Sequence, residues 1–229
     1  MALSTLELIL WSILFVGIHF GVSSTALRPR IIGMLGEKPY LALYSILVTV
    51  FLVMMIIAFR EAPKTAIWGS LPVLRQLPLL VMPLSLILLV GGMMAPNPSS
   101  VGQGRKLKSG YQPTGIQRIS RHPTLVGFSI WGASHILAKG DLPSLIFFGA
   151  FLVLSLLGPG AIDRKRQAEL GEAWEKYAAV TSVIPFQAIV QGRNQFVFAE
   201  IGWWRVSVTV MVYVFMLYLH PFLFGVVPL

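Results

Sequence analysis

The chain contains no cysteine among its 229 residues. This absence excludes disulfide bonds, thiolate zinc sites, iron–sulfur clusters, thioether-attached haem and a thiol nucleophile. Acidic residues are also scarce, with 9 Asp and Glu against 18 Lys and Arg. Histidine, which occurs 4 times, is therefore the strongest metal ligand that remains.

Several enzyme signatures are missing as well. The sequence has neither a Walker loop nor a G-x-S-x-G motif. No Asp or Glu stands beside His19 or His135 to complete a hydrolytic zinc site. Asp141 and Asp163 are expected at opposite ends of one helix, where they cannot act together. No basic domain stands apart from the hydrophobic runs, so the net charge of +9 does not indicate nucleic acid as a partner.

Hydrophobic residues make up 55% of the chain, and the mean hydropathy is +0.76. Such a chain requires lipid as its solvent. Stretches of about 20 apolar residues, long enough to cross a bilayer, are expected at 6–24, 39–59, 77–94 and 203–220. The stretch 124–157 is divided by "AKGDLP", whose Gly140 and Pro143 predict a tight hairpin of two helices. The sequence thus predicts one integral-membrane domain over residues 1–229, an all-α polytopic transmembrane helical bundle of about six spans.

The basic residues are distributed unevenly between the two sides of this bundle. Most follow the first, third and fifth spans, whereas the opposite connections hold Arg60, Lys64, Arg75 and Lys139. Because Lys and Arg accumulate in cytoplasmic connections, we expect both termini outside, in the inner membrane of a bacterium. Positive charges follow the first span rather than precede it, so we expect that span to remain uncleaved.

Two connections on the basic side are longer than turns. The first, at 97–120, is rich in Gly, Pro, Ser and basic residues, which is typical of a functional or mobile loop. The second, at 163–186, begins as a charged helix with Trp174 and Tyr177 at near-helical spacing. It breaks at Pro185. We expect this segment to form an interfacial helix along the cytoplasmic face.

The four histidines differ in their expected depth. His220 is expected at the outer end of the last span, where an interfacial histidine costs little. His122 begins the fourth span after Arg121, and this pair would either mark the membrane surface or hold an anionic group. His19 and His135 lie well inside their spans, so each must be hydrogen-bonded, face a cavity or bind a metal.

Helix geometry limits which histidines can share a metal. His122 and His135 are separated by about 20 Å along one helix and about 140° around it, so one ion cannot take both. A partner must come from another helix, and His19, which lies between two glycines that leave room for a flat ligand, is the candidate. His135 shares its face with small and aromatic residues, namely Gly127, Phe128, Trp131 and Gly132. The same pattern is also typical of close helix packing in membranes.

Three segments together resemble the NnrU family of polytopic membrane proteins. They are "GIHFGVSSTALRP" at 17–29, "RHPTLVGFSIWGASHILAKGD" at 121–141 and "TSVIPFQAIVQGR" at 181–193. The resemblance spans nearly the whole chain. The family includes the 15-cis-ζ-carotene isomerase of carotenoid synthesis, and it is named after a factor linked to nitrite and nitric oxide metabolism.

The resemblance implies a haem b that is held by histidines and works when its iron is reduced. Carried over by motif, the ligand positions fall on His19 and His135, with Arg28 and Arg121 expected to meet the propionates. The implied activity is a redox-dependent cis–trans isomerisation of a poly-cis carotenoid such as 15-cis-ζ-carotene, bound in an apolar cavity. At the position of the first histidine ligand, the isomerase has a sequence similar to His-Ser-Gly, whereas this chain has His19-Phe20-Gly21. The substrate is therefore implied by analogy alone.

Two other functions stay open. The family name implies a non-enzymatic factor that supports nitrite or nitric oxide respiration. The Arg-His-Pro sequence at the start of the fourth span and the later "LGEAWEKY" resemble motifs of the isoprenylcysteine methyltransferase group. Membership of that group would place S-adenosylmethionine near Arg121 and His122. That group shows a paired Glu-Glu ahead of this stretch, whereas this chain has Ala168-Glu169-Leu170-Gly171, so the methyltransferase ranks below the haem protein.

The expected depths of the histidines add one condition. With these span boundaries, His19 lies about 6 Å to the cytoplasmic side of its helix centre and His135 about as far to the outer side. A haem that lies parallel to the membrane plane would bridge that offset. If the depths do not match, His19 with His122 becomes the rival pair.

Overall fold

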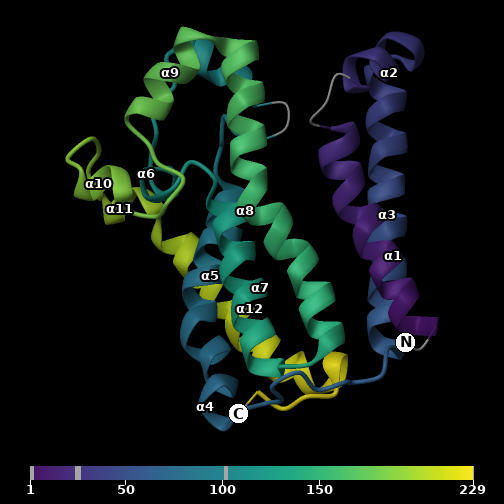
Figure 1. Ribbon diagram of the computed structural model, residues 1–229. Coiled ribbons are helices and arrows are strands. Elements are labelled where there is room, and N and C mark those ends of the chain that lie inside the picture. The colour runs from purple at the N-terminus through teal and green to yellow at the C-terminus, as the bar shows by residue number, and fades with distance from the viewer. Residues whose placement is uncertain (1–2, 24–26, 101–102, 229) are drawn as a thin grey trace.

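The computed structural model describes residues 3–23, 27–100 and 103–228. Its helices form a bundle in which the first helices and the later ones lie on either side of α8 (Figure 1). The first half of the chain forms α1 (Leu3–Gly17), the π-helix η1 (Ile18–Val22), α2 (Leu27–Leu35), α3 (Glu37–Glu61), α4 (Pro72–Arg75), α5 (Leu77–Met94) and the 3-10 helix η2 (Gly104–Ser109). The second half forms α6 (Ile116–Ile119), α7 (Pro123–Lys139), α8 (Leu142–Leu170), α9 (Glu172–Ala179), α10 (Gln187–Val190), α11 (Phe198–Ile201) and α12 (Trp203–Phe224).

Five stretches of the described chain are long and apolar enough to cross a membrane. They are Leu3–Val22, Glu37–Glu61, Pro72–Met94, Leu142–Leu170 and Trp203–Phe224. The other expected span, α7, has 17 residues, at the lower end of the range of about 17–25 that crosses a bilayer. It packs between α5 and α8 inside the same bundle. The all-α transmembrane bundle expected from the sequence is therefore confirmed, with α7 as its shortest member.

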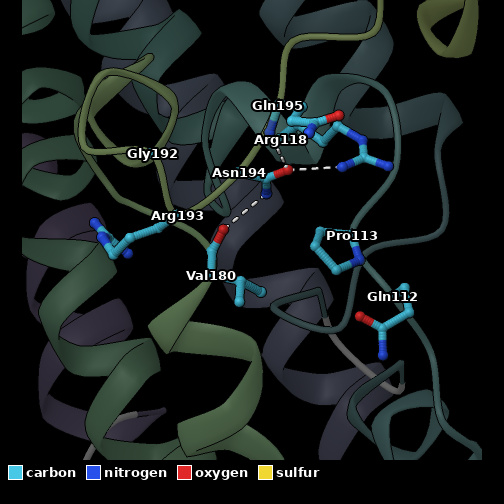
Figure 2. Close-up of a pocket in the computed structure, with 8 residues that line it drawn as sticks. All are labelled: Gln112, Pro113, Arg118, Val180, Gly192, Arg193, Asn194 and Gln195. Atoms are coloured by element: carbon cyan, nitrogen blue, oxygen red, sulfur yellow. Dashed lines mark hydrogen bonds between the residues drawn. The ribbon is translucent and has the colours of Figure 1, made fainter.

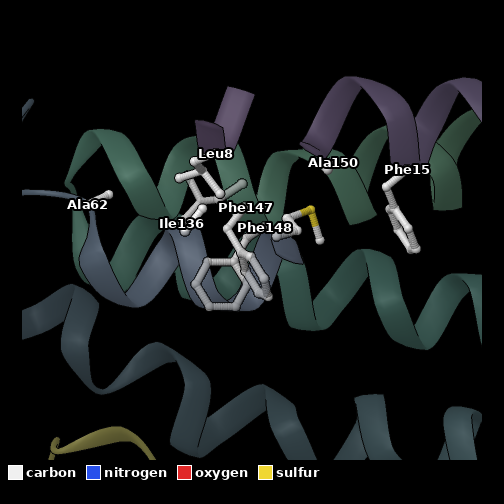
Figure 3. Packing of buried hydrophobic residues seen from close by; sticks show 9 residues of the cluster. Leu8, Phe15, Ala62, Ile136, Phe147, Phe148 and Ala150 are labelled. Atoms are coloured by element: carbon white, nitrogen blue, oxygen red, sulfur yellow. The ribbon is translucent and has the colours of Figure 1, made fainter. Parts of the chain in front are cut away.

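The centre of the bundle is α8, which contacts α7 on one side and α1 and α3 on the other. Buried side chains from these four helices form one apolar cluster, which includes Leu8, Phe15, Ile136, Phe147 and Phe148 (Figure 3). Beyond it, α5 packs on α7 and α12 packs on α5. Because the solvent is lipid, the outward faces of these helices remain apolar, and close packing rather than water exclusion holds the helices together.

The α5–α7 contact shows why small residues lie on α7. The Ser85 hydroxyl donates a hydrogen bond of 2.7 Å to the carbonyl of Gly127. A Cβ at Gly127 would lie 2.8 Å from the carbonyl oxygen of Ser85, closer than real Cβ contacts allow. Only glycine at this position lets the two helix backbones approach so closely.

The predicted hairpin between α7 and α8 is present and tight. Gly140 ends α7 in the left-handed region at φ 61°, where glycine has no steric cost. Asp141 then caps α8, because its Oδ1 accepts the Ser144 amide at 2.8 Å. The two helices therefore run antiparallel, and the start of α7 lies beside the later part of α8.

The helix α8 is longer than a bilayer is thick. Its 29 residues extend about 43 Å at 1.5 Å per residue, against about 30 Å for the hydrocarbon core, and α9 follows at its far end (Figure 1). On α9, Trp174 and Tyr177 are buried against Leu107 of η2. The large apolar residues of α9 thus pack on protein, and its charged residues are exposed.

Candidate functional site

His19 lies in the π-helical turn that continues α1. Its Nδ1 lies 2.7 Å from the carbonyl oxygen of Phe15, and its ring packs edge-on against Phe15 at 4.9 Å between centroids. A carbonyl can only accept, so Nδ1 carries the proton and Nε2 of the neutral ring carries the lone pair. A single π-helical turn inside a helix re-aims the side chains it carries and is frequent at functional sites.

His135 repeats this arrangement on α7. Its Nδ1 lies 2.8 Å from the carbonyl oxygen of Trp131, and its ring packs against Trp131 at 5.6 Å and Phe148 at 5.0 Å between centroids. The lone pair is again on Nε2. In both histidines the nitrogen distal to the backbone is thus suited to bind a metal, and the proximal nitrogen is held by a backbone carbonyl, as in most metal-bound histidines.

A layer of aromatic rings lies between the two histidines. Phe151 of α8 contacts Phe15 at 5.4 Å and Trp131 at 5.1 Å between centroids, which places these three rings at one depth. His19 and His135 each follow this layer by four residues in their own helices, but α1 and α7 reach it from opposite directions, so the histidines lie about 6 Å to either side of it. Side chains in a helix lean toward its N-terminus. Both imidazoles therefore lean toward the aromatic layer that separates them.

The sequence set a condition on the offset between His19 and His135. An offset of about 12 Å between the two helix positions, with imidazoles leaning toward each other, suits a flat group that lies parallel to the membrane. In this layer the ring of Phe151 contacts the rings of both Phe15 and Trp131. The layer must therefore part to admit a flat ligand between His19 and His135.

Arg28 lies on the same side of the layer as His19. Its guanidinium lies 5.7 Å from the ring centre of Tyr40. Tyr40 stacks on Tyr44 at 6.0 Å, and Tyr44 contacts the His19 ring at 6.0 Å. The two tyrosines thus connect the expected anion-binding arginine with the expected ligand.

Arg121 and His122 are brought together with a carboxylate that the sequence reasoning did not assign to them. The Arg121 Nε donates to Asp163 at 3.0 Å and the His122 Nε2 donates to the other oxygen at 2.7 Å. His122 is buried, and burial lowers the pKa of its imidazole, while the hydrogen bond to Asp163 opposes that change. The neutral ring serves as a donor, and the cluster fastens the start of α7 to α8.

His220 takes a position at the end of α12. Its Nδ1 lies 2.8 Å from the carbonyl oxygen of Val226. The helices α12 and α7 both approach the same end of the bundle there (Figure 1). This approach of α12 was not expected from the sequence.

The fold and these histidines define a polytopic α-helical membrane protein with two candidate metal ligands in its interior. The NnrU protein family model matches residues 7–228, and the chain belongs to the NnrU family. It is 39% identical over 82 residues to the chloroplastic 15-cis-zeta-carotene isomerase of Zea mays. It is 38% identical over 81 residues to the protein of that name from Arabidopsis thaliana.

These two alignments are partial. They cover 36% and 35% of this chain, and each covers 22% of the relative. The matched part therefore spans about a fifth of the length of these curated relatives. No solved structure matches the chain.

Proposed function

We propose that this chain binds haem b between His19 and His135 and catalyses redox-dependent cis–trans isomerisation of a poly-cis carotenoid such as 15-cis-ζ-carotene. The observation that carries the proposal is the pair of imidazoles that lean from opposite sides toward one aromatic layer inside the bundle. The names of both curated relatives support the reaction and the substrate class. A carotenoid is also soluble in the lipid that surrounds these helices.

In this proposal each residue of the site has a defined task. His19 and His135 hold the iron through Nε2, while their Nδ1 bonds fix the orientation of both rings. Arg28 meets a propionate, and Tyr40 holds that guanidinium in place. Arg121 is engaged by Asp163, so Arg28 carries the propionate role.

The haem supplies, when reduced, an iron that withdraws π density from a double bond and so lowers the barrier to its rotation. The aromatic layer supplies flat faces on which a polyene can stack, and it keeps water out of the site. No side chain has to move a proton in an isomerisation of this kind. The scarcity of carboxylates inside the bundle is consistent with that chemistry.

The absorption spectrum of the purified protein tests the haem site. We expect non-covalent haem that acidified organic solvent extracts, and a low-spin six-coordinate ferric spectrum. His19→Ala and His135→Ala should each abolish this spectrum, because each removes one of the two histidines that would hold the haem.

His220→Ala is the discriminating control. It should retain the wild-type spectrum, because the proposal gives His220 no bond to iron. If His220→Ala loses the spectrum and His19→Ala keeps it, the ligand pair is His135 with His220 and the proposal is wrong. A protein that stays colourless after haem is added would also contradict it, and would favour the non-enzymatic factor.

A further inference from the structure

A strip of aromatic side chains lies on the surface between α9 and α12. Phe186, Phe196, Phe198 and Trp203 form a continuous chain of ring contacts, at 6.0, 6.3 and 5.2 Å between successive centroids. We call these four residues the aromatic strip. All four are exposed, and Trp203 reaches 72%. The strip therefore presents a row of apolar rings outward rather than packing them into the core.

The backbone under the strip is held in an uncommon conformation. Phe186 has φ 63°, in the left-handed region that a bulky residue rarely adopts. Its amide donates to Ile119 at 2.9 Å, and its carbonyl accepts the amide of Val190, also at 2.9 Å. Strain of this kind persists only where neighbouring contacts impose it, and it is more frequent at binding sites than elsewhere. The result is that Phe186 and Val190, whose side chain is 84% exposed, both face outward.

A polar pocket is lined in part by the residues that directly precede Phe196 of the strip in the chain. It has a volume of about 390 Å³ and is lined by amide side chains, among them Gln112, Asn194 and Gln195, and by two arginines, Arg118 and Arg193 (Figure 2). Residues 192–195 belong to the same segment as the strip. A site with apolar rings on one side and amide and guanidinium donors on the other is suited to an amphipathic anion.

The two arginines of the pocket differ in charge balance. Arg118 is paired with Glu200 at 2.7 Å and bonds Asn194 at 2.7 Å, so its charge is compensated. Arg193, whose guanidinium points away from the other lining residues in Figure 2, donates to neutral acceptors, the side-chain oxygen of Gln191 and the backbone carbonyls of Ala179 and Thr181. These partners carry no negative charge, so its guanidinium keeps its positive charge on the surface beside the pocket.

The strip also marks a depth in the membrane. It ends at Trp203, which is the first residue of the membrane-spanning helix α12. The strip is therefore continuous with a lipid-facing surface and lies at the boundary between acyl chains and headgroups, where aromatic residues are enriched. We propose that this segment binds an anionic phospholipid, with acyl chains along the aromatic strip and the phosphate at Arg193.

Native mass spectrometry of the full-length protein in detergent tests the headgroup. With phosphatidylglycerol and phosphatidylcholine added in equal amounts, the wild type should retain phosphatidylglycerol preferentially. Arg193→Gln should reduce this preference about fivefold, which corresponds to about 1 kcal/mol for one basic residue near an anionic surface. Arg105→Gln is the matched control, because it removes the same charge from an exposed position on η2, and should leave the preference unchanged.

Two further measurements are needed. One distinguishes the charge of Arg193 from its role in holding the loop, and the other distinguishes a bound lipid from free phosphate. Arg193→Lys keeps the charge but loses most of the hydrogen bonds that hold the loop, and should keep most of the preference. If it loses as much as Arg193→Gln, Arg193 only holds the loop and the proposal is wrong. Inorganic phosphate should not displace the lipid, and full displacement would assign the pocket to a free anion instead.

The depth of the strip is tested without changing Arg193. A spin label on Val190→Cys, introduced into this cysteine-free chain, should be accessible to oxygen and protected from a water-soluble nickel complex in a bilayer. A label on Lys108→Cys in η2 is the water-exposed control. Equal exposure of both labels to nickel would place the strip in water and overturn the proposal.

Discussion

At the residue scale, Asp163 is the carboxylate that joins the first residues of α7 to α8. It accepts hydrogen bonds from Arg121 and His122, and the Arg121 and Asp163 side chains are only 15% and 20% exposed. We predict that Asp163→Asn destabilises the protein by about 2 kcal/mol, the order expected when a charge-assisted hydrogen bond to a largely buried partner is lost. Thermal unfolding in detergent measures this effect.

The control for that prediction is an exposed ion pair. Glu172 and Lys176 are 78% and 75% exposed, and such pairs contribute little to stability. Glu172→Gln should therefore leave the unfolding temperature nearly unchanged. An equal effect of both substitutions on the unfolding temperature would show that the hydrogen bonds of Asp163 to Arg121 and His122 do not contribute specifically to stability.

Asp163 also shows which features of a single residue can be predicted from the sequence and which cannot. The separation of Asp141 from Asp163 along one helix was predicted correctly, since it follows from helix length alone. The partners of Asp163 were missed, although the predicted antiparallel hairpin already placed the end of one helix beside the start of the other. The spacing of His19 and His135 along their own helices follows from the fixed rise per residue, whereas the position of α12 beside the end of α7 depends on how α12 packs.

At the element scale, α5 and α7 depend on close backbone approach at Gly127. We predict that Gly127→Ala destabilises the bundle by about 1–3 kcal/mol, the usual cost of overpacking a tight contact, because its Cβ would collide with the Ser85 carbonyl. Gly149→Ala is the matched control on α8, where a Cβ meets nothing within 4 Å. It should be neutral or slightly stabilising, since alanine favours a helix more than glycine does. Similar losses in unfolding temperature for both variants would contradict this account of the α5–α7 contact.

The positions of the long helices were largely predictable from the sequence. The length of each apolar stretch and the glycine or proline residues that interrupt it determine where a membrane-spanning helix begins and ends. The π-helical turn at His19 was not predicted, since it depends on contacts with neighbouring helices rather than on local propensity. The segment 163–186 was correctly expected to begin as a helix, but its Trp174 pairs with η2. The exposed aromatic residues begin only at its last residue, Phe186. Amphipathic spacing alone does not tell which surface an apolar face will contact.

At the scale of the whole molecule, the basic connections predict the orientation in the membrane. Because the chain lacks cysteine, single cysteines can be introduced and labelled without background. We predict that a membrane-impermeant maleimide labels Thr65→Cys in intact bacterial cells but labels Lys108→Cys only after lysis. The reverse pattern would place both termini in the cytoplasm, against the distribution of Lys and Arg.

The measurement that tests the central claim most directly is the redox dependence of isomerisation by the haem-loaded wild-type protein. Anaerobic protein, reduced with dithionite, is incubated with 15-cis-ζ-carotene in detergent, and the isomers are separated by chromatography. The account predicts conversion by the reduced protein, none by the oxidised protein, and none by reduced His135→Ala, because the reaction would need a reduced haem and His135 would be one of the residues that hold it. Unchanged carotene in the reduced wild type, or equal conversion in both redox states, would contradict a haem-dependent isomerase.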